Sequence, residues 1–505
     1  MELLLGIDAG TTSVKSGLFS VDGQCLGVAR QEYQLSTPRA NWAELDPEIY
    51  WQACLSTTQK VLQQVGEKNI SAVSVSSQGE TMIALDAYGK PVYPAIVWLD
   101  NRADREAGTL AEKFAVEVYE RTGIPEIIPT WTACKILWLK QNEPDVFFRA
   151  DKFLLVQDYL IYRLTGEYTT NNSVSCTSLY FDITKGGWWD AVLREIGIGE
   201  KNLPRLVPPG EVIGNVSTEA SVQTGLPQTT KVVGGGMDQS VGAIGAGNIL
   251  PGVVSETTGA ALTIQVTIPS PDVDKHKVIP VYCHSVPGEY LFVPVCPTAG
   301  MAYKWFRDTF AGQEVAQAER DGSDSYDLLS ALAADVPPGS DGLVMLPHLM
   351  GAYSPDPNPA ARGSFTGFTL SHTRGHFARA ILEGVAFLLK RNLEVLQNAG
   401  VDVSEIRSTG GGARSPLWNQ IKSNVCNLPV VTLQNEDTAL LGDAILAGVA
   451  VGVFRTIEEG CGRMVALKDK IVPDFQAADS IASYQRYCDL DQTLNDYYHR
   501  QYKNL

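Results

Sequence analysis

The stretch from Val232 to Gly247 reads VVGGGMDQSVGAIGAG, and the rest of the chain can be organised around it. Its two valines predict a strand, and the three glycines that follow let the backbone approach a ligand or a neighbouring element closely. The small residues after Gln239 have a spacing that favours close helix packing. Asp238 stands at the start of this predicted helix, where it could cap the helix or face a cleft and accept a proton. Taken alone, the stretch favours the cap.

Length and composition describe an ordinary globular protein. A chain of 505 residues is too long for one core, so two domains are expected. Hydrophobic residues make up 44% and charged residues 19%, which is not the composition of a disordered chain. The net charge of -17 argues against a nucleic-acid or anionic membrane partner and suits a protein that acts on small molecules.

The sequence predicts a cytoplasmic location. The opening MELLLGIDAG has no basic region and carries an acid within its first apolar run, unlike a signal peptide. The longest weakly polar run, Thr438 to Phe454, is broken by Asp443 and is shorter than the roughly 20 residues of a membrane span. The nine cysteines include no CxxC pair, which predicts reduced, mostly buried thiols.

Two segments share one hairpin pattern. Leu3–Asp8 predicts a strand, Ala9–Thr12 a tight turn and Ser13–Phe19 a second strand, and Val253–Val266 repeats this order around a Thr-Gly turn. The backbone N–H groups and hydroxyls of such a turn can hold phosphate oxygens, although one hairpin taken alone favours an ordinary turn with polar residues. An acid that ends the first strand, Asp8, could position a magnesium ion. Two such hairpins predict a duplicated architecture that grips phosphates from both sides.

Polar residues also follow other predicted strands, where α/β proteins usually bind ligands. Gln78, Glu80, Asp100 and Arg102 could bind hydroxyl groups, although solvated loop ends would look the same. The turn 410–415 precedes a helix predicted from Pro416, and a glycine turn at that place suits an adenosine or phosphate group.

Residues 103–200 predict accessory helices that contain few candidate functional residues. Trp131 and Lys135 could face a cleft, but the pattern favours core packing for Trp131 and a surface amine for Lys135. No GxxxxGK[ST] loop, GxSxG elbow or HRD…DFG set occurs in the sequence. If the chain handles ATP, it therefore does so with paired hairpins.

Together these segments resemble the FGGY family of carbohydrate kinases, and the resemblance runs nearly end to end. It implies the family's α/β fold, a two-domain actin-like (ribonuclease H-like) ATPase with an interdomain cleft. The domains would be residues 1–247, which bind the sugar, and 248–505, which bind the nucleotide. The motifs that carry it are GIDAGTTSVK (6–15), SSQGET (76–81), IVWLDNR (96–102), GGGMDQSVGAIGAG (234–247), SETTGAA (255–261), the segment 355–386, TGGGARSPLWNQI (409–421) and LGDAILAGVAVG (441–452).

The resemblance also implies residue roles and the cofactors ATP and Mg²⁺. Asp238 would be the catalytic base that accepts the proton of a sugar hydroxyl attacking the γ-phosphate, and Asp8 would lie near the metal. Homodimers are common in the family, so a homodimer is possible. The implied substrate-binding residues are Gln78, Gly79, Glu80, Asp100, Asp238 and Gln239. The implied ATP-binding residues are Gly10, Thr11, Thr12, Lys15 (more often Arg in glycerol kinases), Thr258, Gly259, Gly300, Gly411, Gly412 and Ala413.

The departures from the family pattern concern the substrate. Glycerol kinases usually read Gln-Arg-Glu where this chain has Gln78-Gly79-Glu80, and xylulokinases usually read Gln-Met-His-Gly. We interpret the glycine as opening space and removing a charged donor, which suits a sugar larger than glycerol. A ketopentose such as xylulose is the first expectation, and glycerol, erythritol or gluconate are the alternatives. A non-catalytic sugar or nucleotide sensor and an actin-like filament protein are rivals that the intact motifs disfavour.

Overall fold

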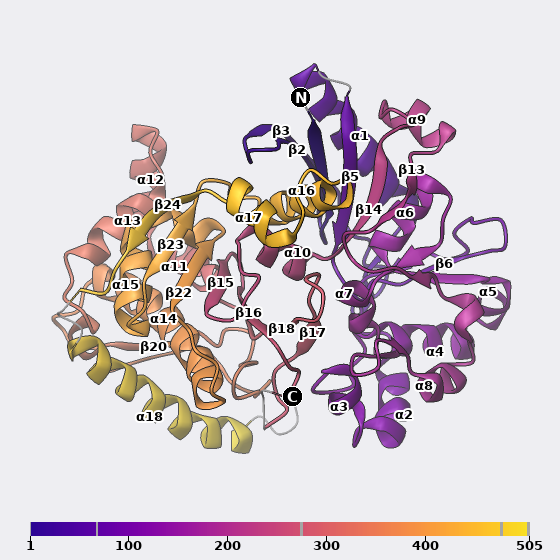
Figure 1. The fold of residues 1–505 in the computed structure, drawn as a ribbon. Coiled ribbons are helices and arrows are strands. Elements are labelled where there is room, and N and C mark those ends of the chain that lie inside the picture. The colour runs from indigo at the N-terminus through magenta and orange to yellow at the C-terminus, as the bar shows by residue number, and fades with distance from the viewer. Residues whose placement is uncertain (1, 67–68, 273–275, 475–477, 502–505) are drawn as a thin grey trace.

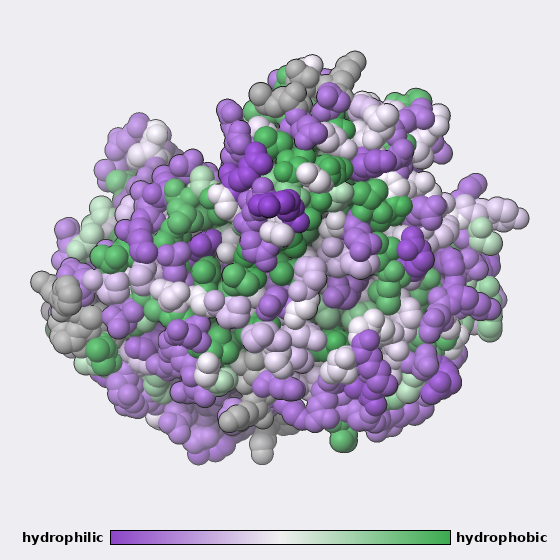
Figure 2. Space-filling model, in the orientation of Figure 1, coloured by the Kyte–Doolittle hydropathy of each residue, from purple (hydrophilic) through white to green (hydrophobic). Residues whose placement is uncertain are grey.

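The computed structural model describes residues 2–66, 69–272, 276–474 and 478–501. The chain forms two α/β halves that lie side by side, the N-terminal half on the right of Figure 1 and the C-terminal half on the left. Each half is built on one mixed sheet, so the predicted two-domain α/β fold is confirmed. On the face shown in Figure 2, hydrophilic residues dominate the periphery and hydrophobic residues gather toward the middle.

The N-terminal sheet is ordered β13-β14-β5-β1-β2-β3. β1, β2 and β3 are antiparallel neighbours, whereas β5 and β14 run parallel to β1. The apolar run of β1 is buried along its length, as expected for a central strand covered on both faces. The strands are β1 (Leu3–Ala9), β2 (Ser13–Ser20), β3 (Cys25–Glu32), β5 (Ile70–Ser77), β13 (Val212–Asn215) and β14 (Lys231–Met237).

The C-terminal sheet is ordered β17-β18-β16-β15-β22-β23-β24. Here too an antiparallel set (β15, β16, β18) adjoins two parallel strands, β22 and β23. The duplication predicted from the two hairpins is therefore confirmed. The strands are β15 (Val253–Thr258), β16 (Leu262–Ile268), β17 (Val281–Cys283), β18 (Tyr290–Phe292), β22 (Glu405–Thr409), β23 (Val430–Leu433) and β24 (Leu467–Ile471), with β19 (Val295–Cys296) beside β16.

Helices cover the faces of both sheets. In the N-terminal half, α1 (Pro47–Val65) begins where Asp46 caps its first turn and Pro47 occupies the first helical position. The other main helices are α6 (Val156–Thr165), α9 (Thr218–Thr224), α10 (Asp238–Gly245), α11 (Gly300–Phe310), α12 (Gly312–Asp321), α13 (Ser325–Ala334), α14 (Arg374–Asn398), α15 (Pro416–Cys426), α16 (Thr438–Ala450), α17 (Ile457–Met464) and α18 (Ala478–Gln501).

Two helices, α10 and α16, cross in direct backbone contact. A Cβ added to Gly442 would lie 2.0 Å from the carbonyl oxygen of Val241, and one added to Gly245 would lie 1.8 Å from that of Thr438. The same helix α16 packs on β1, where a Cβ on Gly6 would lie 2.4 Å from the carbonyl oxygen of Leu440. The small residues after Gln239 therefore serve close helix packing, as the sequence predicts.

Most of the region 103–200 forms the predicted accessory helices around their own apolar cluster, whereas α6 packs in the core of the N-terminal sheet. Trp131 is buried in the cluster of the accessory helices, as expected. Lys135, however, is fully buried, so its interpretation as a surface amine is wrong. The helices are α2 (Asp104–Phe114), α3 (Val118–Thr122), α4 (Thr132–Asn142), α5 (Pro144–Arg149), α7 (Asn172–Ser175) and α8 (Asp190–Ile196).

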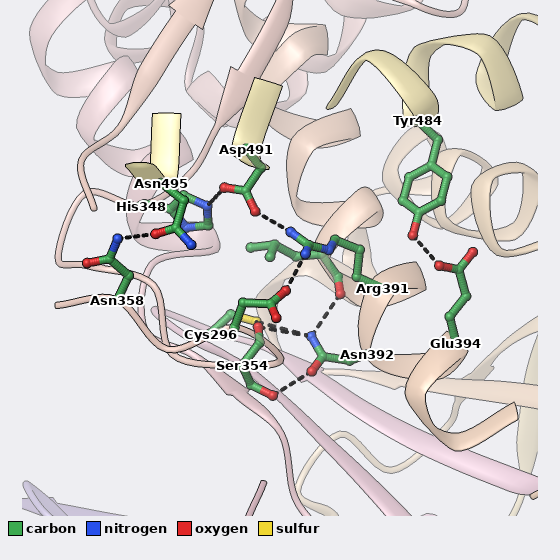
Figure 3. A network of polar contacts seen from close by, with 12 residues as sticks. Cys296, His348, Ser354, Asn358, Arg391, Asn392, Glu394, Tyr484, Asp491 and Asn495 are labelled. Carbon is green, nitrogen blue, oxygen red and sulfur yellow. Dashed lines mark hydrogen bonds and ion pairs between the residues drawn. The ribbon is translucent and has the colours of Figure 1, made fainter. Parts of the chain in front are cut away.

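The last helix, α18, is fastened across the C-terminal half by a polar network (Figure 3). Asp491 accepts hydrogen bonds from His348 at 2.9 Å and from Arg391 of α14. Tyr484 donates to Glu394 at 2.5 Å. The helix thereby holds the loop that follows β20 (Val344–Leu346) against α14.

The structure also describes the thiols and the lengths of the helices. All nine cysteines are free thiols, and six of them are buried, as predicted. None of the described helices is both long and apolar enough to cross a membrane.

The helix crossing makes a direct prediction about stability. Gly442→Ala should lower the free energy of unfolding by about 1–3 kcal/mol, because its methyl group would overlap the Val241 carbonyl oxygen. Gly108→Ala is the matched control, since this glycine also lies within a helix but has no atom within 4 Å of an added Cβ. The control should be stabilised by about 0.5–1 kcal/mol through helix propensity. Chemical denaturation measures both variants, and equal midpoints would contradict the close crossing.

Candidate active site

Asp238 stands at the junction of β14 and α10. It is the first residue of the helix, the cap position belongs to Met237, and no side chain caps this helix. Its Oδ1 accepts a hydrogen bond from the adjacent Gln239 N–H at 2.7 Å. Gly236 turns the chain with φ 141°, and a Cβ there would lie 2.3 Å from Ser285 Oγ. The glycine run thus permits a tight turn that brings Asp238 to a cleft.

That cleft, of about 140 Å³, lies between the two halves. The first residues of α10 and α16 both border it, so two helix N-termini add positive potential there. The N-terminal half contributes Asp8, Asp238 and Gln239 to its lining, and the C-terminal half contributes Thr257, Thr409 and Thr438.

Both cleft carboxylates hold their protons more tightly than usual. Burial, and to a smaller extent repulsion from Asp8, raise the pKa of Asp238 to about 7. Burial also raises the pKa of Asp8 to about 6, with the nearby Lys15 ammonium acting in the opposite direction. The cleft therefore favours a cation or a proton near these two groups.

Glu80 occupies a strained turn between the cleft and the accessory helices. Its φ is 56°, and the Thr81 N–H donates to the Gly79 carbonyl oxygen at 2.6 Å across it, which makes a γ-turn of the uncommon positive-φ kind. Such strain costs of order 1–3 kcal/mol and persists only where neighbours fix the conformation. Burial raises the pKa of Glu80 to about 8, opposed by Lys135 and reinforced by Asp238.

Gly79 does not open space for a larger sugar, and that interpretation is wrong. A Cβ added there would lie 2.7 Å from Thr177 Oγ1, so the glycine serves close packing against the turn 176–178. The Glu80 N–H donates to the same hydroxyl at 3.1 Å. The missing arginine therefore leaves no vacant volume in the direction of a side chain.

Three other residues predicted to bind substrate are already engaged. Gln78 donates to the Tyr50 hydroxyl at 2.9 Å and accepts from Thr11 Oγ1 at 3.0 Å. Asp100 is fully buried, with both oxygens bound by the Arg102 guanidinium at 2.8 and 2.7 Å. Gln239 accepts from Gln265 of β16 at 2.6 Å, which links the two halves. In this arrangement Asp100 holds its loop in place, whereas Glu80 has no described hydrogen bond to its carboxylate.

The first phosphate hairpin presents its turn beside the cleft. Gly10 closes the turn by donating to the Ser13 carbonyl oxygen at 3.0 Å, and Thr12 is exposed. The Thr11 hydroxyl accepts from Trp98 Nε1 at 2.8 Å. Lys15 forms an ion pair with Asp437, which immediately precedes α16. The hairpin is thereby tied to the C-terminal half.

The second hairpin turns its two threonines in opposite directions, as successive strand residues must. Thr258 is buried and donates to Glu256 at 2.6 Å, while Lys422 donates to both of them. Thr257 lines the cleft and bonds with Thr409 at 2.8 Å. The hydroxyl that faces the cleft is therefore that of Thr257, which the sequence reasoning missed although strand alternation could have indicated it.

Beside the same hairpin, Gly259 and Gly300 meet backbone to backbone. The Gly300 N–H donates to the Gly259 carbonyl oxygen at 3.0 Å, and a Cβ on Gly300 would lie 2.2 Å from that oxygen. This contact places the start of α11 against the hairpin turn.

A larger pocket of about 370 Å³ adjoins the turn 411–414. Ala413 lines it, and Gly412 packs on Thr258, where a Cβ would lie 2.6 Å from the Thr258 Cβ. Gly411 is exposed at the turn. Asn419 also lines the pocket, and its buried Oδ1 has no described partner, although its Nδ2 donates to the Ala413 carbonyl oxygen at 2.7 Å. The sequence offered no signal for Asn419 beyond its place one turn into α15.

Comparison with known proteins identifies the family. The model of the FGGY family of carbohydrate kinases, N-terminal domain, matches residues 3–245, and the C-terminal domain model matches 254–451. The chain belongs to the FGGY family of carbohydrate kinases. It is therefore an ATP-dependent carbohydrate kinase, as the resemblance of its motifs implies.

Relatives carry two kinds of name. A gluconokinase of Bacillus subtilis (strain 168) is 35% identical over 453 residues, 89% of this chain and 88% of its own. A xylulose kinase of the same organism is 30% identical over 496 residues, 98% of this chain and 97% of its own. The crystal structure of xylulose kinase from Rhodospirillum rubrum superposes with a TM-score of 0.90 at 30% identity, covering 98% of this chain and 100% of that one.

The opposite directions of the two threonines predict different defects. Thr257→Val should raise the KM for ATP about five-fold, because a hydrogen bond to the nucleotide is lost. Its free energy of unfolding should fall by less than about 1 kcal/mol, because Thr409 loses its bond to Thr257 but keeps the one to the Glu256 carbonyl oxygen. Thr258→Val should instead lower the free energy of unfolding by about 1–3 kcal/mol, because Glu256 and Lys422 each lose a buried partner. Steady-state kinetics and thermal unfolding of the two variants measure this contrast. The reverse pattern would mean that Thr258 faces the nucleotide.

Proposed function

We propose that this kinase transfers the γ-phosphoryl group of ATP to a hydroxyl of a neutral ketopentose such as xylulose, with Asp238 as the general base. The observation that carries the proposal is the position of Asp238. It lies in a cleft between the halves, at a helix N-terminus, where the adjacent Gln239 N–H donates to it and its pKa is raised to about 7. A base is most effective when its pKa is near the working pH, because it is then free to accept a proton and basic enough to keep it.

The phosphate side of the cleft suits a nucleotide triphosphate. Phosphate oxygens would meet the exposed Thr12 of the turn Gly10–Thr12, the Thr257 hydroxyl that lines the cleft, and backbone N–H groups at the starts of α10 and α16. Thr258 and Gly259 would shape the second turn around them. The pocket beside Gly411, Gly412 and Ala413 would bind the adenosine, and Asn419 would form a hydrogen bond with the adenine ring. Lys15 lies close to the first turn, where its charge would favour phosphate. Gly300 would support the second turn through its hydrogen bond to the Gly259 carbonyl oxygen.

Mg²⁺ fits the residues that line the cleft. No group of three or more His, Cys, Asp or Glu side chains suited to a metal occurs among the described residues. Magnesium usually takes one or two carboxylates and completes its shell with phosphate oxygens and water. Asp8 can serve in this way, because the one side-chain hydrogen bond described for its carboxylate, from Ser76, is long at 3.4 Å. When bound, the ion would neutralise phosphate charge.

The charges around the sugar side favour a neutral substrate over an aldonate. Asp8, Glu80 and Asp238 all approach this region, and their mutual repulsion raises pKa values. Arg102 is bound to Asp100 and Glu44, so its charge is already paired. A substrate carboxylate would add a further negative charge. Sugar hydroxyls, in contrast, can donate hydrogen bonds to the Glu80 carboxylate and accept them from the Gln239 amide.

Three further expectations stay proposals. The division into domains 1–247 and 248–505 follows the duplicated sheets. The proposed cytoplasmic location rests on the free thiols. The proposed homodimer rests on the observation that homodimers are common in the family.

Replacing the base should separate binding from chemistry. Asp238→Asn keeps the size of the side chain but cannot accept the proton, so kcat should fall by about 10²–10⁴-fold while the Kd for ATP stays within about two-fold. Asp190→Asn is the matched control, because Asp190 is likewise the first residue of a helix, α8, but is exposed. Coupled ADP release and nucleotide titration measure the two quantities. Near-normal turnover of Asp238→Asn would remove this residue from the base role.

A substrate panel tests the charge argument. The purified protein is assayed with D-xylulose, L-xylulose, D-ribulose, glycerol, erythritol and gluconate. A ketopentose should give a kcat/KM more than about ten-fold above that of gluconate, because an unpaired carboxylate is costly in a buried site. Higher activity on gluconate would overturn the substrate assignment but not the kinase chemistry. ATP binding without turnover of any compound would favour the sensor alternative.

A further inference from the structure

Glu80 is held in its uncommon backbone conformation from both sides. Its N–H donates to Thr177 Oγ1, as described above, and its carbonyl oxygen accepts two hydrogen bonds from α4. Thr132 Oγ1 donates to that oxygen at 3.1 Å and Lys135 Nζ donates at 3.0 Å. Because backbone conformation sets where the side chain can point, these contacts determine the direction of the Glu80 carboxylate.

Lys135 is an unusual residue for this task. Its side chain is fully buried, and its ammonium has one described hydrogen bond although it carries three donors. Burial lowers the pKa of Lys135 to about 7. Methionine or leucine would fill the same space in α4 without the cost of burying a charge. A purely packing role therefore does not account for a lysine at this position.

Charge balance with Asp100 does not account for it either. The Asp100 carboxylate already receives two bonds from the Arg102 guanidinium, and the Ala43 N–H donates to it at 2.6 Å. Arg102 is itself stacked on Trp42, with its guanidinium carbon 3.6 Å from the ring centre. This cluster is complete without Lys135, whose direct contact is with Glu80.

We propose that Lys135 is a positioning residue for sugar binding: it fastens the Glu80 turn so that the Glu80 carboxylate faces the substrate hydroxyls. The inference rests on the proposed function, in which Glu80 contacts the sugar. Thr132 supports the same carbonyl oxygen as a second, neutral donor. Lys135 acts through Glu80 and does not itself touch the reacting atoms.

The test compares the same substitution at two lysines of one helix. Lys135→Met should raise the KM for the sugar about ten- to a hundred-fold, because a misdirected Glu80 loses its hydrogen bonds to the substrate. The kcat and the KM for ATP should each change less than about three-fold, since Asp238 and the phosphate turns are untouched. Lys140→Met is the control: Lys140 also donates to a backbone carbonyl oxygen, that of Glu195 at 3.4 Å, and should leave all three constants unchanged.

A double-mutant cycle with Glu80→Ala shows whether Lys135 acts through Glu80. If it does, Lys135→Met adds less than about two-fold to the sugar KM of Glu80→Ala. Additive effects would overturn the proposal and indicate direct contact between Lys135 and the sugar. An unchanged sugar KM for Lys135→Met, or equal losses in kcat and in ATP affinity, would also overturn it.

Two provisions keep the result decisive. Lys135→Gln, which keeps an N–H donor without a charge, is measured in parallel and replaces the methionine variant if that variant does not fold. The substrate is whichever sugar of the panel the unaltered kinase uses best. Failure of xylulose as the substrate therefore leaves the test of Lys135 intact, and a normal sugar KM in the Lys135 variants refutes the inference whatever the sugar is.

Discussion

The crossing of α10 and α16 is the contact on which the site depends. Gly245 and Gly442 bring the two backbones together where no side chain fits, so the helices cannot shift along one another without collision. Each helix begins at the cleft, one with Asp238 and the other with Thr438. The rigid crossing therefore fixes a carboxylate of one half relative to a helix N-terminus contributed by the other.

The site concentrates negative charge that the fold does not neutralise. Ser76 has a single hydroxyl proton, and the shorter of its two contacts is with Asp443 at 2.7 Å, against 3.4 Å for Asp8. Asp443 also accepts a hydrogen bond from the Ser74 hydroxyl at 2.6 Å. The buried carboxylate of α16 therefore has two short hydrogen bonds, whereas Asp8 has only the long one from Ser76 among the described contacts. The carboxylates with few hydrogen-bond donors are those that border the cleft. Burial there raises their pKa values and leaves a strong attraction for cations and protons.

Sequence reasoning found what local patterns encode. Both hairpins, the strand-to-helix junction at Asp238 and the glycine turn before α15 follow from turn chemistry and apolar periodicity. It also indicated the duplication, because the two hairpins repeat one pattern. The roles of individual side chains came from the family resemblance, and these remain predictions for Asp238 and the ATP-binding residues.

What the sequence could not show depends on contacts between distant segments. Gly79 looked like vacant space because nothing in its neighbourhood in the chain reveals Thr177 behind it. Lys135 looked like a surface amine because lysines usually are, and its partner lies 55 residues away at Glu80. Strand alternation indicates that Thr257 and Thr258 point in opposite directions, but that Thr258 is the inward one depends on Lys422, 164 residues away. Such errors arise wherever tertiary contact, not local propensity, decides the role of a side chain.

The packing also differs from a simple division of the chain into two halves. The segment between β23 and β24 leaves the C-terminal sheet, and its helix α16 packs on β1 of the N-terminal sheet. Along the way Asn435 donates to the Gly23 carbonyl oxygen at 3.1 Å, and Asp437 pairs with Lys15. In return, Arg407 of β22 donates to the Ala246 carbonyl oxygen at the end of α10, at 2.6 Å. Segments of each half therefore pack against the other half. Neither half by itself contains both the carboxylates and the opposing helix N-terminus that form the cleft.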